Sequence, residues 1–216
     1  MMLEDREPRV LVGEIAMDEA AQFPRVFQTN IDRFYQRVIV PALAGLPRHA
    51  VLTVGETASM DAFLGRCAAQ VDNHTADEAA KAFALTLDGL FERQLSRWAR
   101  AHGSTANGLD KLLAACAQIS SIDLDAISIA QVFRELHLAA NVVRHGEGRS
   151  SVELRRLAPH LWGSEPIHLY DLAPRPTPAS EELRIRADDL MRYTRAIICF
   201  WGHADPLPMA VREPSW

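Results

Sequence analysis

The chain has 216 residues, of which 48% are hydrophobic and 24% charged, and its formal net charge is −5. This composition is typical of a folded soluble protein and argues against extensive disorder, and the length is enough to bury a core within one domain. Because the net charge is negative, there is no overall attraction to nucleic acid or acidic membranes. Any contact with RNA therefore requires a local basic patch.

Three cysteines, Cys67, Cys116 and Cys199, lie far apart and beside apolar neighbours. An odd number at such spacings indicates buried free thiols in a reducing compartment. The N-terminal segment MMLEDREPRV lacks the apolar core of a signal peptide, and the longest apolar run, residues 196–201, is too short to span a membrane. We therefore expect a cytoplasmic protein that makes no membrane contact.

The first expected helix begins at Phe23, with Pro24 in its first turn, because apolar residues recur at helical spacing as far as Val38. Pro41 should then stop or kink it. Two short segments stay open: residues 10–12, as tail or strand, and residues 50–58, as helix or strand.

Two separate helices are expected next. The first has a core stripe that consists of Met60, Phe63, Leu64, Cys67 and Val71. Thr75 and Glu78 fit a capping box that would begin the second helix, which continues through Trp98 and ends at Gly103 in a left-handed exit.

The remaining segments predict further short helices at 109–119 and 151–157, a longer helix at 128–145 and a last helix at 188–202. A proline-rich loop at 163–178 separates the helix at 151–157 from the helix at 188–202. Residues 167–172 and 183–186 are candidates for two short paired strands. We therefore predict an all-α fold. It would be a helical bundle with at most a minor β-hairpin near the C-terminal third, built as a single domain over residues 1–216.

The helix at 128–145 sorts its residues by chemistry. Ser128 and Gln131 fit a capping box at its start, and Gly146 ends it. At about 100° per residue, one arc is a core stripe and the opposite arc is polar. The core stripe consists of Ile129, Val132, Leu136, Ala139, Ala140 and Val143, and the polar arc of Arg134, His137, Asn141, Arg144 and His145.

The polar arc has two interpretations. His137 and His145 are about 12 Å apart along the axis, too far for one zinc ion, so we expect no metal. The sequence also has no Gly-rich phosphate-binding loop and no paired-Cys signature, so we expect no other cofactor. An imidazole near a guanidinium is suited to metal-independent RNA cleavage, because the imidazole activates the 2′-hydroxyl while the cation stabilises the phosphorane. An ordinary solvated helix side has the same composition.

Residues 135–162, ELHLAANVVRHGEGRSSVELRRLAPHLW, followed by DDLMRYTRAIICFW at 188–201, resemble helical domains of uncharacterised bacterial proteins akin to the HEPN superfamily. The likeness covers about residues 125–203. It implies an α-helical bundle, commonly dimeric, and in many members an RNase of a toxin, defence or RNA-processing system. The HEPN motif has an Arg, often followed by Asn or another polar residue, and then a His, with four to six residues between the Arg and the His. Asn141 and His145 match, whereas Ala140 stands at the Arg position.

The resemblance implies a HEPN-like protein that acts on RNA or binds it. In its more specific form it implies a metal-independent endoribonuclease of a bacterial toxin or defence system. The catalytic candidates are His145, Asn141 and Arg144, and the substrate contacts would be Arg134, His137 and Arg149. The expected partners are RNA, a second copy of the chain and a protein encoded nearby. The alternative is a non-catalytic interaction or dimerisation module, such as a degenerate HEPN domain, an antitoxin or a scaffold.

Two other Arg–His pairs have the motif spacing, Arg97–His102 and Arg155–His160. Two such matches are as many as chance predicts, so they carry no weight.

Overall fold

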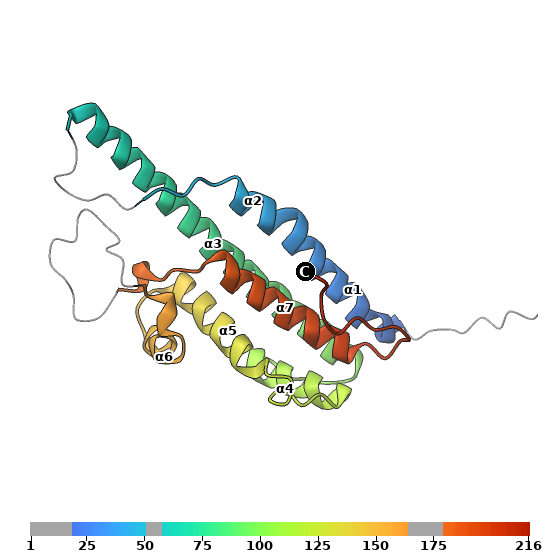
Figure 1. Cartoon of the computed structure of the whole chain (residues 1–216). Helices are drawn as coiled ribbons and strands as arrows, with labels where there is room; N and C mark the ends of the chain where they lie inside the picture. Colours follow the sequence, from blue (N-terminus) through green and yellow to red (C-terminus); the bar gives the residue numbers. More distant parts are fainter. Residues whose placement is uncertain (1–18, 51–57, 164–178) are drawn as a thin grey trace, which may run out of the picture.

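The computed structural model describes residues 19–50, 58–163 and 179–216 (Figure 1). Its helices are α1 (Glu19–Phe34), the π-helical turn η1 (Tyr35–Ile39), α2 (Val40–Ala44), α3 (Met60–Ala101), α4 (Leu109–Ser120), α5 (Ala130–His145), α6 (Arg149–Leu157), the 3₁₀ turns η2 (Pro159–Leu161) and η3 (Ser180–Glu182), and α7 (Ala187–Ala204). The described ranges contain no strand, so the predicted all-α fold is confirmed. Residues 183–186 are irregular, and the segments 10–12, 51–57 and 167–172 lie outside the described residues.

The core is built around α7, which packs against α1, α3 and α5 (Figure 1). Aromatic rings from three of these helices meet there: the ring centroids of Phe91 and Phe133 are 4.6 Å apart, and those of Phe91 and Phe200 are 5.6 Å apart. Such offset and edge-on contacts stabilise aromatic clusters beyond simple burial. The same core also buries Trp98, Tyr193 and Trp201.

Helix α3 corrects the prediction of two separate helices. The Thr75 hydroxyl donates to the carbonyl of Val71, one turn back, instead of capping a new helix, and the observed N-cap is Ser59. The N-terminal half of α3 extends beyond the other helices in Figure 1. Its expected core stripe is therefore largely exposed, and we call the exposed members the α3 apolar stripe: Met60, Phe63, Leu64 and Val71.

Pro24 and Pro41 do not delimit the first helix as predicted. Helix α1 begins at Glu19, so Pro24 lies inside it. Before Pro41 the chain changes to a π-helical turn in which the Val40 amide donates to the Tyr35 carbonyl, and α2 then continues to Ala44. The wider turn accommodates a proline that has no amide proton to donate, so Pro41 alters the helical geometry without ending the helix.

The predicted core stripe of α5 and its predicted end at Gly146 are both confirmed. Gly146 has a φ of 70°, and its amide donates to the carbonyl of Val142. The start of the helix differs, because Ile129 is the N-cap and no side chain caps the helix. Ser128 instead has a φ of 57°. The stripe residues are either buried or packed against the core: Ile129, Val132, Leu136, Ala139, Ala140 and Val143.

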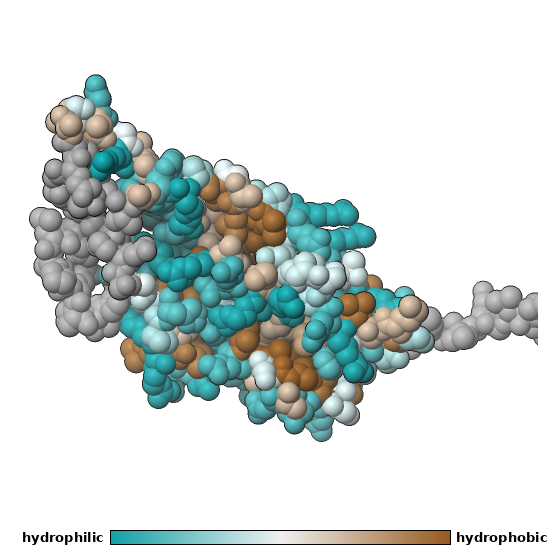
Figure 2. Space-filling view, in the orientation of Figure 1, coloured by the Kyte–Doolittle hydropathy of each residue, from teal (hydrophilic) through white to brown (hydrophobic). Residues whose placement is uncertain are grey.

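The surface in the view of Figure 2 is mostly polar, with apolar side chains gathered in separate patches. No helix among the described residues is both long enough and apolar enough to cross a bilayer.

The three cysteines are free, as predicted, but only Cys116 is fully buried. Burial raises the pKa of its thiol to about 12, so this thiol is unreactive at neutral pH.

Candidate functional site

The polar arc of α5 faces away from the core, but its members differ in their partners. Arg134, Arg144 and His145 are exposed, and His137 and Asn141 are half-buried. Arg134 Nε lies 3.0 Å from Glu153 of α6, whose carboxylate also pairs with the Arg134 Nη2. The charge of Arg134 is therefore balanced within the protein.

His137 is held by α3. Its Nδ1 lies 3.2 Å from Oδ1 of Asp88, a buried carboxylate. The hydrogen bond to Asp88 raises the pKa of His137 above its ordinary value of 6.5, against the opposing effect of burial. The pair joins α5 to α3 and orients the imidazole.

Four residues at the end of α5 and the start of α6 are not engaged in this way. Within the described part of the chain, the side chains of Asn141, Arg144, His145 and Arg149 have no hydrogen bond or ion pair. We call these four residues the α5–α6 basic end. Arg149 is the first residue of α6 and follows His145 after a turn of three residues.

Glu147, the acidic residue within that turn, has its charge balanced. Its carboxylate pairs with Arg155 and accepts a hydrogen bond of 2.9 Å from the Ser151 hydroxyl. The hydrogen bond from Arg155 is the largest cause that lowers the pKa of Glu147 below its ordinary value. The carboxylate therefore stays ionised and paired, and it leaves the cationic groups of the basic end available to an external anion.

The burial of position 140 explains why an alanine, and not an arginine, precedes Asn141. Its side chain is 0% exposed and packs in the core stripe of α5. An arginine there would place a guanidinium among apolar side chains, at a large cost in desolvation. Any cation at this site must come from the exposed Arg144 or Arg149.

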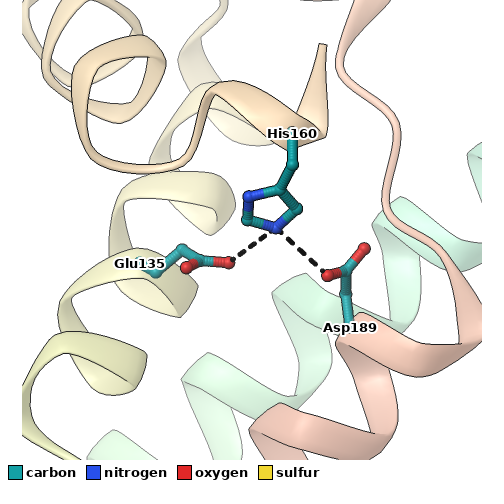
Figure 3. Close-up of side chains that lie close together, drawn as sticks. All are labelled: Glu135, His160 and Asp189. Carbon is teal, nitrogen blue, oxygen red and sulfur yellow. Dashed lines mark ion pairs between the residues drawn. The ribbon is translucent and has the colours of Figure 1, made fainter. Parts of the chain in front are cut away.

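A second cluster, which the sequence analysis did not identify, lies on the inner side of α5 (Figure 3). Glu135 is only 3% exposed, and its Oε1 accepts a hydrogen bond of 2.7 Å from the Tyr193 hydroxyl. Arg192 donates to both oxygens of the same carboxylate, and also to Asp189 Oδ1 over 3.3 Å. Two buried carboxylates and one guanidinium thus meet where α5 packs on α7.

His160 reaches the same cluster from η2. Its Nε2 lies 3.4 Å from Asp189 Oδ1 and 3.7 Å from Glu135 Oε1, and its side chain is 50% exposed (Figure 3). These are the residues that could hold a metal ion in the described structure, since one ligand atom from each lies within 4.8 Å of the others. The cluster therefore has a buried acidic floor and a solvent-facing imidazole.

The groups around Glu135 have strongly shifted pKa values. Burial, followed by the charge of Glu135, raises the pKa of Tyr193 well above its ordinary value. Burial, the largest single cause, would lower the pKa of Arg192, but the hydrogen bonds and charges of Glu135, Tyr193 and Asp189 together outweigh it and the pKa rises. Tyr193 therefore stays a neutral donor, and Arg192 stays charged at any physiological pH.

One signal in the sequence pointed to this cluster. Glu135 lies at the edge of the predicted core stripe of α5, about 40° around the helix from Ala139, and an acidic residue that faces the core requires a buried partner. The identity of the partners could not be read from the sequence, because His160 and Arg192 come from elements distant in the chain.

Comparison of the chain with family models, curated proteins and solved structures found no match.

Proposed function

We propose that the α5–α6 basic end binds the phosphate backbone of RNA in the cytoplasm, as a HEPN-like protein would. The observation that carries the proposal is that Arg144, His145 and Arg149 are exposed and have no partner in the described residues. The neighbouring arginines Arg134 and Arg155, by contrast, are paired with Glu153 and Glu147.

The chemistry of the basic end suits a phosphodiester. A guanidinium donates two parallel hydrogen bonds to phosphate oxygens, and Arg144 and Arg149 can each supply such a fork. Helix α6 begins at Arg149, so the positive end of its dipole adds to the local potential. Asn141 supplies both donors and an acceptor, which suit a sugar hydroxyl or a base edge.

RNA cleavage is the more specific form of this proposal, and His145 would carry it. A neutral imidazole can accept the proton of a 2′-hydroxyl, and Arg144 can stabilise the charge that develops on the phosphorane. Asn141 precedes His145 by one helical turn, but no described residue hydrogen-bonds the His145 ring and fixes its orientation. The structure therefore supports RNA binding more directly than it supports cleavage.

RNA binding is tested with fluorescence anisotropy on a labelled single-stranded RNA. The Arg144→Gln/Arg149→Gln variant should lose affinity by on the order of tenfold at 0.1 M salt, because two phosphate contacts are removed. The matched control is Arg37→Gln/Arg100→Gln, which removes the same charge from exposed positions on η1 and α3. An equal loss in both variants would show that only net charge matters and would refute the site.

Cleavage is tested by incubating wild type and His145→Ala with the same RNA in EDTA and resolving the products on a denaturing gel. We expect the wild type to cleave RNA but not DNA of the same sequence, because the mechanism uses the 2′-hydroxyl. The His145→Ala variant should still bind RNA without cutting it. Cleavage that survives the substitution would remove His145 from the reaction.

The α3 apolar stripe favours a second candidate, a non-catalytic module that forms a homodimer. Contiguous exposed apolar residues on one helix commonly mark a protein interface, and this stripe lies where α3 extends beyond the bundle. Sedimentation should then show a dimer that Leu64→Asp/Val71→Asp converts to a monomer. The control Val26→Asp/Val38→Asp, at exposed valines of α1 and η1, should stay dimeric. A monomeric wild type would exclude the homodimer.

A further inference from the structure

The geometry around His160 is unusual for a network of ion pairs. Its Nε2 faces two carboxylate oxygens, yet the distances of 3.4 Å to Asp189 and 3.7 Å to Glu135 exceed the usual hydrogen-bond range of about 2.7–3.2 Å. Two ligand atoms that share one tetrahedral ion, each about 2.1 Å from it, are about 3.4 Å apart. The two distances from the His160 imidazole are therefore close to those between ligands of one ion.

We propose that Glu135, His160 and Asp189 bind a divalent transition-metal ion, for which Zn²⁺ is the best fit. Each ligand comes from a different element, α5, η2 and α7, and the close-up shows the three side chains converging (Figure 3). One imidazole nitrogen and two carboxylate oxygens leave a fourth position for water. The mixed ligand set disfavours Mg²⁺, which prefers oxygen ligands in octahedral geometry.

The carboxylates are held in place by further hydrogen bonds, as metal-ligating carboxylates usually are. Asp189 Oδ2 accepts the backbone amide of Arg186 over 3.0 Å and so caps α7, while Oδ1 lies 3.4 Å from His160 Nε2 and also accepts a hydrogen bond of 3.3 Å from Arg192. Glu135 is oriented by Tyr193 and Arg192. Because Glu135 Oε1 already accepts from both of these donors, it would be the weakest of the three ligands, in agreement with its longer distance from His160.

Charge and access both suit a cation. The two carboxylates and the Arg192 guanidinium sum to one negative charge when the imidazole is neutral, so an ion would meet a net negative site. The carboxylate side chains are only 4% and 9% exposed, whereas that of His160 is 50% exposed and provides the route of entry. None of the three ligands belongs to the α5–α6 basic end, so this inference goes beyond the proposed function.

The test is isothermal titration of the full chain, stripped of metal with EDTA and dialysed, with Zn²⁺, Mn²⁺ and Mg²⁺ in separate runs. We expect one Zn²⁺ per chain and much weaker binding of Mg²⁺. The His160→Gln variant should bind Zn²⁺ at least about 100-fold more weakly, since even changes behind the ligands weaken metal binding by about 10–100-fold. The matched control is His145→Gln, an exposed histidine outside the cluster, which should bind Zn²⁺ as the wild type does.

Two results would overturn the metal site: no Zn²⁺ binding by the wild type, or the same affinity in the wild type, His160→Gln and His145→Gln. The first would leave a network of ion pairs alone, and the second would assign the binding to other surface groups. Because His160 is half exposed, its replacement should preserve the fold, which circular dichroism verifies. RNA affinity should be the same in His160→Gln and the wild type, so failure of the metal site is distinguishable from failure of RNA binding.

Discussion

Glu135 joins α5 to α7, because its buried carboxylate accepts hydrogen bonds from Tyr193 and Arg192. A buried charge is tolerated only when its partners replace the lost water, and removing one partner leaves the charge partly uncompensated. Tyr193, itself 0% exposed, is a neutral donor to the Glu135 carboxylate. Its hydroxyl can be deleted without changing the formal charge of the site.

The Tyr193→Phe variant should lose about 1.5–3 kcal/mol of unfolding free energy, the usual range for a hydrogen bond to a charged group. Urea denaturation measures the loss. Tyr35→Phe is the matched control, because the Tyr35 ring stacks on Trp216 and the structure gives its hydroxyl no hydrogen bond in the described residues. A change within about 0.5 kcal/mol is expected there. Equal losses in both variants would show that Glu135 does not need the Tyr193 hydroxyl.

His137 should titrate above 6.5, because Asp88 stabilises its protonated form, whereas His203 should titrate below 6.5, because burial and Arg212 disfavour its charge. NMR titration of the imidazole signals measures both values. Asp88→Asn should move the pKa of His137 down. If His137 titrated below His203, the Asp88 contact would be wrong.

The same shift fixes the sign of a stability effect. Since the pKa of His137 is raised in the folded state, its protonation stabilises the fold fully below the unfolded pKa of about 6.5. That contribution is lost as the pH rises through the raised folded pKa. The stability difference between the wild type and His137→Gln should therefore be larger at low pH than at high pH.

At the scale of elements, α3 has two halves with different energetics. Leu87 is fully buried in the core, whereas Leu64 is exposed on the projecting half. Leu87→Ala should cost about 2–5 kcal/mol, through lost burial and a cavity, and Leu64→Ala less than about 0.5 kcal/mol. Thermal or urea denaturation of the two variants measures the difference. A large loss at Leu64 would mean that the α3 apolar stripe is covered in solution.

The sequence predicted which face of α5 is buried, but not where the helix begins. The core stripe and the outward polar arc of α5 follow from helical periodicity alone, and both are observed. The boundary at Thr75 failed because its hydroxyl can either cap a new helix or bond to the preceding turn, and only the continuous packing of α3 decides between them. His160 could not be placed, because its contacts link η2 to α5 and α7, and no local pattern encodes such distances.

At the scale of the whole molecule, the last residues return over α1 and α7. Trp216 stacks on Tyr35 with a centroid distance of 4.5 Å and donates to Asp32, and Arg25 pairs with Asp205. Gly202 lies beneath this segment: a Cβ there would overlap the carbonyl oxygen of Val211 and lie 2.8 Å from Arg212 Cα. The close approach therefore requires glycine.

Gly202→Ala should destabilise the protein by about 1–3 kcal/mol, because the segment above it must move. Gly65→Ala is the control with the opposite sign. A Cβ at Gly65 meets nothing within 4 Å, so the helix should gain about 0.5–1 kcal/mol from the better propensity of alanine. Differential scanning calorimetry gives both values. A neutral Gly202→Ala would indicate that the C-terminal residues do not pack on α7.

The whole molecule has a net charge of −5, so RNA would have to bind at the α5–α6 basic end against the overall repulsion. The most direct test is the salt dependence of RNA affinity, because each phosphate contact contributes a slope of about −0.7 in log K against log salt for single strands. The wild-type slope should become shallower by about 1.4 in Arg144→Gln/Arg149→Gln and stay unchanged in Arg37→Gln/Arg100→Gln. Identical slopes for the wild type and Arg144→Gln/Arg149→Gln would contradict the proposal that the α5–α6 basic end contacts RNA.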